Sequence, residues 1–270
     1  MKLRYTFSLG LLVVVSTALQ AHDFFFRMDT FFVAPGATAR IRALNGTFST
    51  SENSITRDRL RDLSVVSPSG RTQADTAFWS STGDTSIFTL RAGTAGTYVV
   101  GASLIPREIT LEAKDFNTYL ADDGIPDVLA ARKRDGELAK PATERYAKHI
   151  KAVVQVGSTR SGDFAVVLGY PAELVPLDNP YRLKPGSVLR VRAMVDSKPV
   201  ANQLVVSGGR TPSGGRFQER RVRTDASGIA RVPLSSRGQY YVKFINMAPY
   251  RGAEKLDYES KWATLTFELR

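Results

Sequence analysis

Two histidines, His22 and His149, are the strongest candidate metal ligands in a chain of 270 residues that contains no cysteine. His22 follows Ala21, and a cleavage between these two residues would make His22 the first residue of the finished protein. It would then offer two nitrogen donors, the free α-amino group and imidazole Nδ1, which together close a chelate ring on a divalent metal. Their usual pKa values of about 8 and about 6.5 allow a metal to displace the protons near neutral pH.

Such a pair of nitrogen donors prefers copper or nickel over zinc, manganese or iron. Asp23 adds a carboxylate beside it, and His149 is the one residue that can add a second imidazole. We therefore predict a metal site made by His22, Asp23 and His149. Two alternatives stay open: an exposed N-terminal histidine without a ligand, and a solvated His149 on a strand, where the neighbouring Lys151 opposes a cation.

The first 21 residues have the pattern of a secretory signal peptide. Lys2 and Arg4 form a short positive region, and residues 7–19 form an apolar run that is too short for a comfortable membrane span. Ala21 is a small residue of the kind that precedes a cleavage site. The pattern predicts an exported protein.

The position of the cut decides whether the metal site can exist. Cleavage after Ala21 creates the amino donor on His22, whereas a cut after Ala18 leaves Leu-Gln-Ala ahead of it. An uncleaved anchor is the remaining alternative. Removal of the signal peptide takes away Lys2 and Arg4, so the formal net charge falls from +11 to +9.

Composition excludes several classes of site. Without cysteine, the chain cannot form disulfides, thiolate zinc sites, iron–sulfur clusters, cysteine nucleophiles or a lipoprotein anchor. An exported basic protein meets anionic lipids, polysaccharides and metal complexes, so we expect no nucleic-acid partner. A solvated surface rich in arginine and lysine is the simpler explanation of the charge.

Enzyme motifs are not found in the sequence. There is no Gly-x-Ser-x-Gly elbow and no phosphate-binding glycine-rich loop of the Walker or Rossmann type. An N-terminal histidine brace with oxidative copper chemistry is a remote alternative. We therefore expect a protein that is not an enzyme.

An internal repeat predicts the fold. Residues 31–43 (FFVAPGATARIRA) and 181–193 (YRLKPGSVLRVRA) are both led by an aromatic residue, carry a Pro-Gly turn and continue with the alternation of a half-buried strand. The likeness continues in the same order with residues 63–71 and 204–210, and then with residues 93–101 and 235–244. Short strands separated by turn residues indicate β-sandwiches. We expect a mainly β fold with two sandwich domains.

The middle of the chain differs, because residues 112–140 contain few β-branched residues. Helical spacing is found in two groups, Phe116, Tyr119 and Leu120, and Val128, Leu129 and Arg132. These groups predict two short helices, followed by a strand over residues 146–156. We divide the chain into a signal peptide (1–21), an N-terminal sandwich (22–168), a proline-rich linker (169–182) and a C-terminal sandwich (183–270).

Three further segments have structural or functional interpretations. The run Phe24, Phe25 and Phe26 should begin the first strand, with Phe25 on the face opposite to the other two. The segment 216–223 (RFQERRVR) places four arginines around an expected hairpin that could bind an anionic glycan or lipid head group, or could simply be solvated. Asp122-Asp123-Gly124 lacks the alternating acids of an EF-hand, so we interpret it as a turn.

The chain resembles the bacterial periplasmic proteins of the DUF4198 family. The matching pieces are HDFFF at residue 22, the first Pro-Gly strand, FNTYLADDGI, ERYAKHIKAVVQVG and LGYPAELVPLDNPYRLKPG. The C-terminal half is also similar to transthyretin-like or Cna-B-like sandwiches in KPVANQLVV and TDASG. The resemblance implies two immunoglobulin-like or transthyretin-like β-sandwich domains with a short helical insertion between them, and a periplasmic location.

Some members of this family are labelled as nickel or cobalt uptake components, which implies a divalent metal (nickel, cobalt or copper) and a metal-transport membrane component as partner. The resemblance does not extend to His149, whose position in the family is usually not histidine. Two functions follow. The first is a periplasmic accessory protein that binds the metal through His22, and the second is a non-catalytic envelope module that binds a protein or an anionic glycan.

Overall fold

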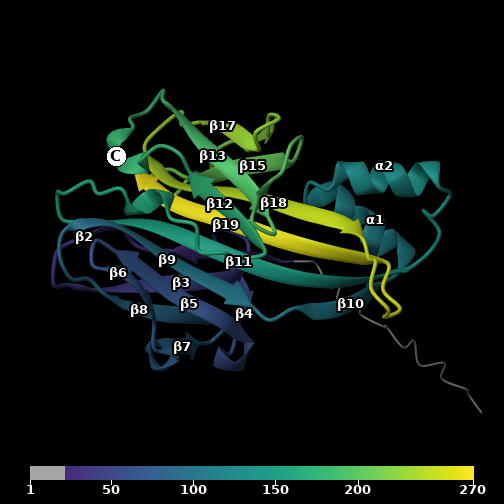
Figure 1. Cartoon of the computed structure of the whole chain (residues 1–270), viewed down its shortest axis with the longest axis horizontal. Coiled ribbons are helices and arrows are strands. Elements are labelled where there is room, and N and C mark those ends of the chain that lie inside the picture. Colours follow the sequence, from purple (N-terminus) through teal and green to yellow (C-terminus); the bar gives the residue numbers. More distant parts are fainter. Residues whose placement is uncertain (1–21) are drawn as a thin grey trace, which may run out of the picture.

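The structure is a computed structural model that describes residues 22–270. The predicted signal peptide (1–21) lies outside the described residues. Three β-sheets and two short helices make up the fold (Figure 1). The predictions of a mainly β sandwich fold and of two short helices are confirmed.

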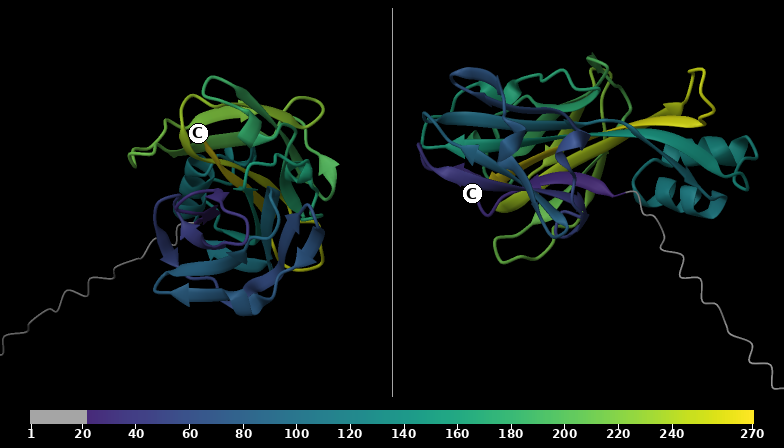
Figure 2. Two further views of the ribbon diagram at one scale, coloured as in Figure 1. Left: turned by 90° about the vertical axis from the view of Figure 1, so that its left-hand side faces the viewer. Right: turned by 90° about the horizontal axis from the view of Figure 1, so that it is seen from below.

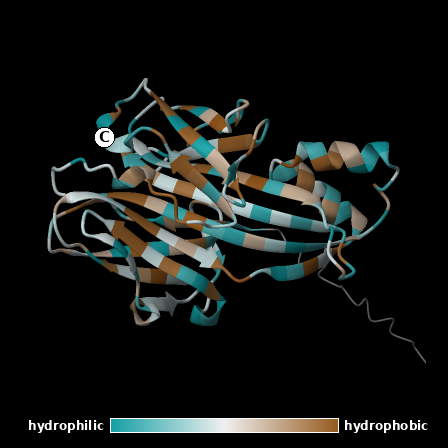
Figure 3. Ribbon diagram, in the orientation of Figure 1, coloured by the Kyte–Doolittle hydropathy of each residue, from teal (hydrophilic) through white to brown (hydrophobic). Residues whose placement is uncertain are grey.

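The largest sheet forms the middle of the molecule. Its strands follow the order β16(Arg220–Arg223), β15(Leu204–Arg210), β18(Gly238–Pro249), β19(Tyr258–Leu269), β11(Ala142–Val156), β9(Gly96–Leu104), β5(Leu60–Ser67) and β6(Gly70–Gln73), and β2(Phe32–Val33) and β10(Arg107–Leu111) add to β11. Neighbouring strands are antiparallel apart from β11, which runs parallel to β19 and to β2. Hydrophilic and hydrophobic residues alternate along many of these strands (Figure 3).

A smaller sheet covers each face of the central sheet (Figure 1). On one face lie β1(Asp23–Arg27), β3(Thr38–Gly46), β8(Thr85–Arg91) and β7(Trp79–Thr82), with β4(Ser51–Asn53) paired to β3. On the other face lie β12(Ala172–Pro176), β13(Val188–Val195), β14(Lys198–Pro199) and β17(Ile229–Pro233). The left-hand view of Figure 2 shows these layers end-on, with the two outer sheets on opposite sides of the central sheet.

Strand β11 contributes to both cores because its side chains alternate between its two faces. Ile150, Ala152 and Val154 lie in the core under the β1–β3–β8 sheet, whereas Val153 lies in the core under the β12–β13–β17 sheet. The expected alternation at the start of the chain is also confirmed. Phe24 and Phe26 enter the first of these cores, and Phe25 belongs to a separate aromatic cluster with Phe48 and Tyr241.

The two halves of the chain have equivalent strand orders. On either side of the β11–β19 pair the central sheet continues as β9–β5–β6 and as β18–β15–β16. The outer strands β1, β3 and β8 correspond in the same way to β12, β13 and β17. A half-turn about an axis along the β11–β19 pair keeps strand directions and exchanges the faces of the sheet, which is why the two outer sheets lie on opposite faces.

The second set of strands begins with β12, inside the segment 169–182 that the proline content marks as a linker. The two halves share the central sheet, and backbone hydrogen bonds between β11 and β19 join them. None of the helices within residues 22–270 has both the length and the apolar character needed to cross a membrane.

The two helices lie between β10 and β11 and cover one end of the central sheet (Figure 1). They are α1(Ala113–Asp122) and α2(Pro126–Arg134), and short 3-10 turns occur at Arg57–Arg59, Thr76–Phe78, Asp163–Ala165 and Pro180–Arg182. Phe116, Tyr119 and Leu120 of α1 pack with Tyr258 and Trp262 of β19, as their helical spacing predicts. Proline at the first position of α2 suits a helix start, because the missing N–H would have no intrahelical partner there.

A buried ion pair links the central sheet to one outer sheet. Lys151 of β11 and Glu173 of β12 contact each other, and their side chains are 3% and 2% exposed. Lys151 Nζ also donates to the carbonyl of Val166 at 3.0 Å, and the Glu173 carboxylate accepts the backbone N–H of Leu168 at 2.6 Å. Each charge is therefore compensated inside the protein, and removing one partner leaves the other as a buried charge without a counter-charge.

We expect Glu173→Gln to lower the free energy of unfolding by about 3–5 kcal/mol, because it leaves the Lys151 charge buried without a counter-charge. The double variant Lys151→Met with Glu173→Gln should lose less unfolding free energy than the sum of the losses in the two single variants. Urea denaturation measures all three. The exposed pair Arg223–Asp127 serves as the control, and Asp127→Asn should cost about 0–1 kcal/mol. A cost of only about 0–1 kcal/mol for Glu173→Gln would contradict the role of Glu173 as the buried counter-charge of Lys151.

Candidate functional site

His22 lies directly before β1, beside two cavities of about 420 Å³ each. Its imidazole Nε2 is 3.1 Å from Glu52 Oε2, and its backbone carbonyl accepts a hydrogen bond from Lys148 Nζ. Burial lowers the pKa of His22 from its usual 6.5, while the Glu52 carboxylate acts in the opposite direction. Two strands distant in the sequence, β4 and β11, thus hold the residue at which the sequence predicts the mature N-terminus.

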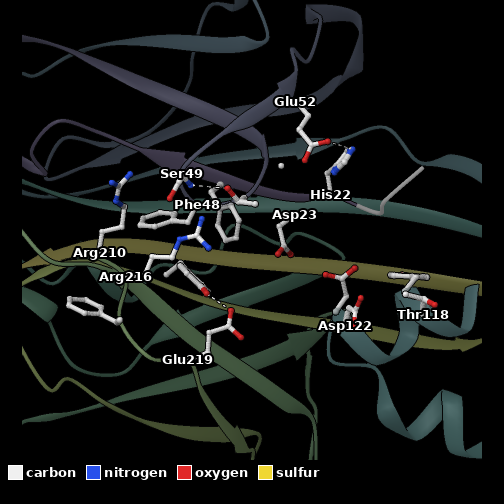
Figure 4. Close-up of a pocket in the computed structure, with 18 of the residues that line it drawn as sticks. His22, Asp23, Phe48, Ser49, Glu52, Thr118, Asp122, Arg210, Arg216 and Glu219 are labelled. Atoms are coloured by element: carbon white, nitrogen blue, oxygen red, sulfur yellow. Dashed lines mark hydrogen bonds and ion pairs between the residues drawn. The ribbon is translucent and has the colours of Figure 1, made fainter. Parts of the chain in front are cut away.

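The first cavity extends away from His22, and its two ends are lined by side chains of opposite charge (Figure 4). Helix α1 contributes Asp115, Thr118 and Asp122 to one end. The segment that leads from β15 to β16 contributes Arg210 and Arg216 to the other. Phe25, Phe48 and Tyr241 also line this cavity.

Asp23 is held by a buried lysine. Lys243 Nζ forms an ion pair with Asp23 Oδ2 and lies 3.7 Å from Asp123 Oδ1. Within residues 22–270, Asp23 Oδ1 is buried and has no hydrogen-bond partner. Burial, together with the Asp23 charge, raises the pKa of Asp123 to about 7. The segment interpreted as a turn therefore also brings an acid to the Asp23 side of the cavity.

The second cavity contains a buried acid and a buried base from β11. Glu144 accepts hydrogen bonds from Tyr119 at 3.1 Å and from Ser260, and burial raises its pKa to about 7. Lys148 Nζ donates to Asn45 Oδ1 at 3.0 Å, and burial lowers its pKa to about 8. Both shifts disfavour the charged form, as expected for groups removed from water.

The structure does not bring His149 to His22. His149 follows Lys148 on β11, and successive side chains of a strand point to opposite faces. Its Nδ1 lies 2.9 Å from Ser103 Oγ, and Nε2 has no hydrogen-bond partner among the described residues. His149 is 2% exposed, and burial lowers its pKa to about 3. The expectation of a solvated His149 is therefore wrong.

Sequence reasoning singled out His22 and Asp23 as candidate residues, but it did not single out Glu52, Glu144 or Lys148, which the structure places near them. These residues come from separate strands, and no motif links them before the chain folds. In the part of the chain that the structure describes, no three His, Asp or Glu side chains form a group arranged to hold a metal ion.

Glu144 should contribute a fall in stability as the pH rises from about 4.5 to about 7, because the folded protein keeps this proton up to about pH 7 and the unfolded chain releases it near 4.5. Asp123, with its raised pKa, contributes in the same direction, and His149, with its lowered pKa, contributes in the opposite direction. The contribution of Glu144 amounts to about 3 kcal/mol. Glu144→Gln should flatten this dependence, and the exposed Glu112→Gln should not. Denaturation at several pH values measures the effect, and an unchanged slope in Glu144→Gln would show that another group is responsible.

Comparison with known proteins provides a family but no activity. Curated protein sequences give no match. Among solved structures, Salmonella alpha-2-macroglobulin reacted with methylamine is similar with a TM-score of 0.23 and 11% identity, covering 92% of this chain and 15% of that one. A mutant of the same protein has a TM-score of 0.22 and 10% identity, covering 91% and 15%. This chain thus spans a small fraction of the length of either structure.

The family comparison covers most of the chain. The family model described as a domain of unknown function, DUF4198, matches residues 19–248. The match includes both outer sheets, both helices and all residues that line the first cavity. The chain belongs to the DUF4198 family.

Proposed function

We propose that the protein is an exported, periplasmic accessory protein that binds nickel, cobalt or copper through His22 as its first residue. The observation that carries this proposal is the contact of His22 Nε2 with Glu52. A carboxylate on Nε2–H holds the imidazole in the tautomer whose lone pair is on Nδ1. Nδ1 is the nitrogen that can close a chelate ring with the α-amino group of the same residue.

The charges around His22 both favour and oppose a cation. Asp23 supplies the next carboxylate, and its buried Oδ1 has no hydrogen-bond partner within residues 22–270. Lys148, bonded to the His22 carbonyl, opposes a cation, but its pKa of about 8 lets it lose charge in mildly alkaline solution. Metal binding should therefore strengthen with rising pH, because Lys148 and both nitrogen donors lose protons in the same direction.

The proposed site differs from the set predicted from the sequence. His149 lies on the other face of β11, so the proposal uses His22 and Asp23 as ligands and Glu52 as the residue that orients the imidazole. A metal-transport membrane component is the partner that this role requires. The alternative of a non-catalytic envelope module that binds a protein or an anionic glycan stays a prediction.

The amino-terminal donor can be tested with a single added residue. Protein that starts at His22, verified by mass spectrometry, is titrated with Ni(II) and Cu(II) by calorimetry and compared with protein carrying one extra alanine. The extension keeps the imidazole but moves the free amino group, and should weaken binding at least about tenfold, or 1.4 kcal/mol. Equal affinity of the two forms would refute the chelate.

The orienting role of Glu52 has its own prediction. Glu52→Gln should weaken metal binding about 10- to 100-fold, the range measured when a residue hydrogen-bonded to a histidine ligand is changed. Glu112→Gln removes an exposed acid from the start of α1 and serves as the matched control for net charge. If both variants lose affinity equally, Glu52 acts only through its charge.

A further inference from the structure

Arg210 and Arg216 line one end of the first cavity, which we call the arginine end. Within residues 22–270, neither Arg210 nor Arg216 contacts a carboxylate closely enough to form a salt bridge, and the two residues are joined by a β-bridge. The Arg210 guanidinium donates to the Gly214 carbonyl at 2.9 and 3.2 Å, which fixes its position. Glu219 lines the same cavity, but its carboxylate accepts the Tyr241 hydroxyl at 2.6 Å.

The positive charge at this end affects its surroundings. Burial and the Arg210 charge both lower the pKa of Arg27, which has no acidic salt-bridge partner in the described part of the chain. A guanidinium presents a planar fork of N–H donors that matches a carboxylate. The guanidinium groups of the arginine end are therefore suited to bind an anionic group of a ligand.

The middle of the cavity is aromatic. Phe25, Phe48 and Tyr241 contact one another with ring centroids 5.1 to 5.4 Å apart. All three are buried, so their positions are set by packing before any ligand binds. Such a wall suits an apolar or aromatic part of a small molecule.

The other end is acidic. Asp115, Thr118 and Asp122 are spaced three and four residues apart on α1, so they share one face of the helix, and all three line the cavity. Asp115 and Asp122 make no ion pair within residues 22–270. In the close-up, Thr118 and Asp122 lie on the side opposite to Arg210 and Arg216 (Figure 4).

We propose that this cavity binds a small zwitterionic molecule, of the amino-acid or short-peptide kind, with its carboxylate at Arg210 and Arg216 and its cationic group at the aspartates of α1. An apolar or aromatic segment of the ligand lies against Phe48 and Tyr241. The volume of about 420 Å³ falls within the range of small-molecule sites. This site goes beyond the metal proposal, because it uses neither the amino group nor the imidazole of His22.

The test uses the dipeptide lysyl-phenylalanine, which carries its cations, its ring and its carboxylate in this order. Binding is measured by calorimetry with EDTA present and compared with that of two matched probes. One probe is the same dipeptide with an amidated C-terminus, and the other is the same dipeptide with both amino groups acetylated. The unmodified dipeptide should bind at least about tenfold more tightly than either probe, a difference of 1.4 kcal/mol. Arg216→Gln should abolish the preference for the free carboxylate, and Asp122→Asn the preference for the free amines.

Arg220→Gln is the matched control, because Arg220 is an exposed arginine of the neighbouring strand β16 and does not line the cavity. It should leave all three affinities unchanged. No binding of the dipeptide at millimolar concentration, equal binding of the three probes, or equal effects of Arg216→Gln and Arg220→Gln would each overturn the proposal. So would binding that appears only when Ni(II) replaces EDTA. The protein with the added N-terminal alanine should bind the dipeptide like the native form, which separates this result from the metal test.

Discussion

The parallel pairing of β11 with β19 is the interaction on which the rest of the structure depends. It joins two sets of antiparallel strands into one sheet, from Glu144 opposite Tyr258 to Ala152 opposite Thr266. Parallel strands are normally buried on both faces, because their connections cover the sheet. Here the two outer sheets cover opposite faces instead, one from each half of the chain. The side chains of β11 consequently alternate between two different cores.

The same strand explains the unusual charges of the candidate site. Glu144, Lys148 and Lys151 are all buried, and each finds its partner in a different place: the helical end, the β1–β3 sheet and the β12–β13 sheet. Ionisable groups in a central strand cannot reach water, so their pKa values move toward the neutral form unless a counter-charge is close. The electrostatics beside His22 are thus a property of the architecture, not of a local motif.

The sequence was sufficient to predict the mainly β fold, several of its strands and the two helices, but not which residues gather around His22. Pro-Gly turns and period-2 alternation mark β3 and β13, and helical spacing marks α1. Alternation assigns a side chain to a face without saying what covers that face. A solvated His149 was therefore one expectation, whereas the face that His149 shares with Lys151 is covered by β12, where Glu173 pairs with this lysine. Glu52 and Lys148 meet His22 only through tertiary contacts, which no spacing in the chain reveals.

The two halves differ clearly in the connection that leads into the β11–β19 pair. Between β9 and β11 the chain inserts β10 and both helices, whereas the corresponding connection between β18 and β19 is the short loop of residues 250–257. The cavity beside α1 is lined by residues of this insertion, among them Asp115, Thr118 and Asp122. Both helices and the 250–257 loop lie outside the strand pairing of the central sheet, so either connection can change in length or sequence while the pairing of β11 with β19 stays intact. The 250–257 loop is, by the same reasoning, the natural position for lengthening the chain without disturbing the shared sheet.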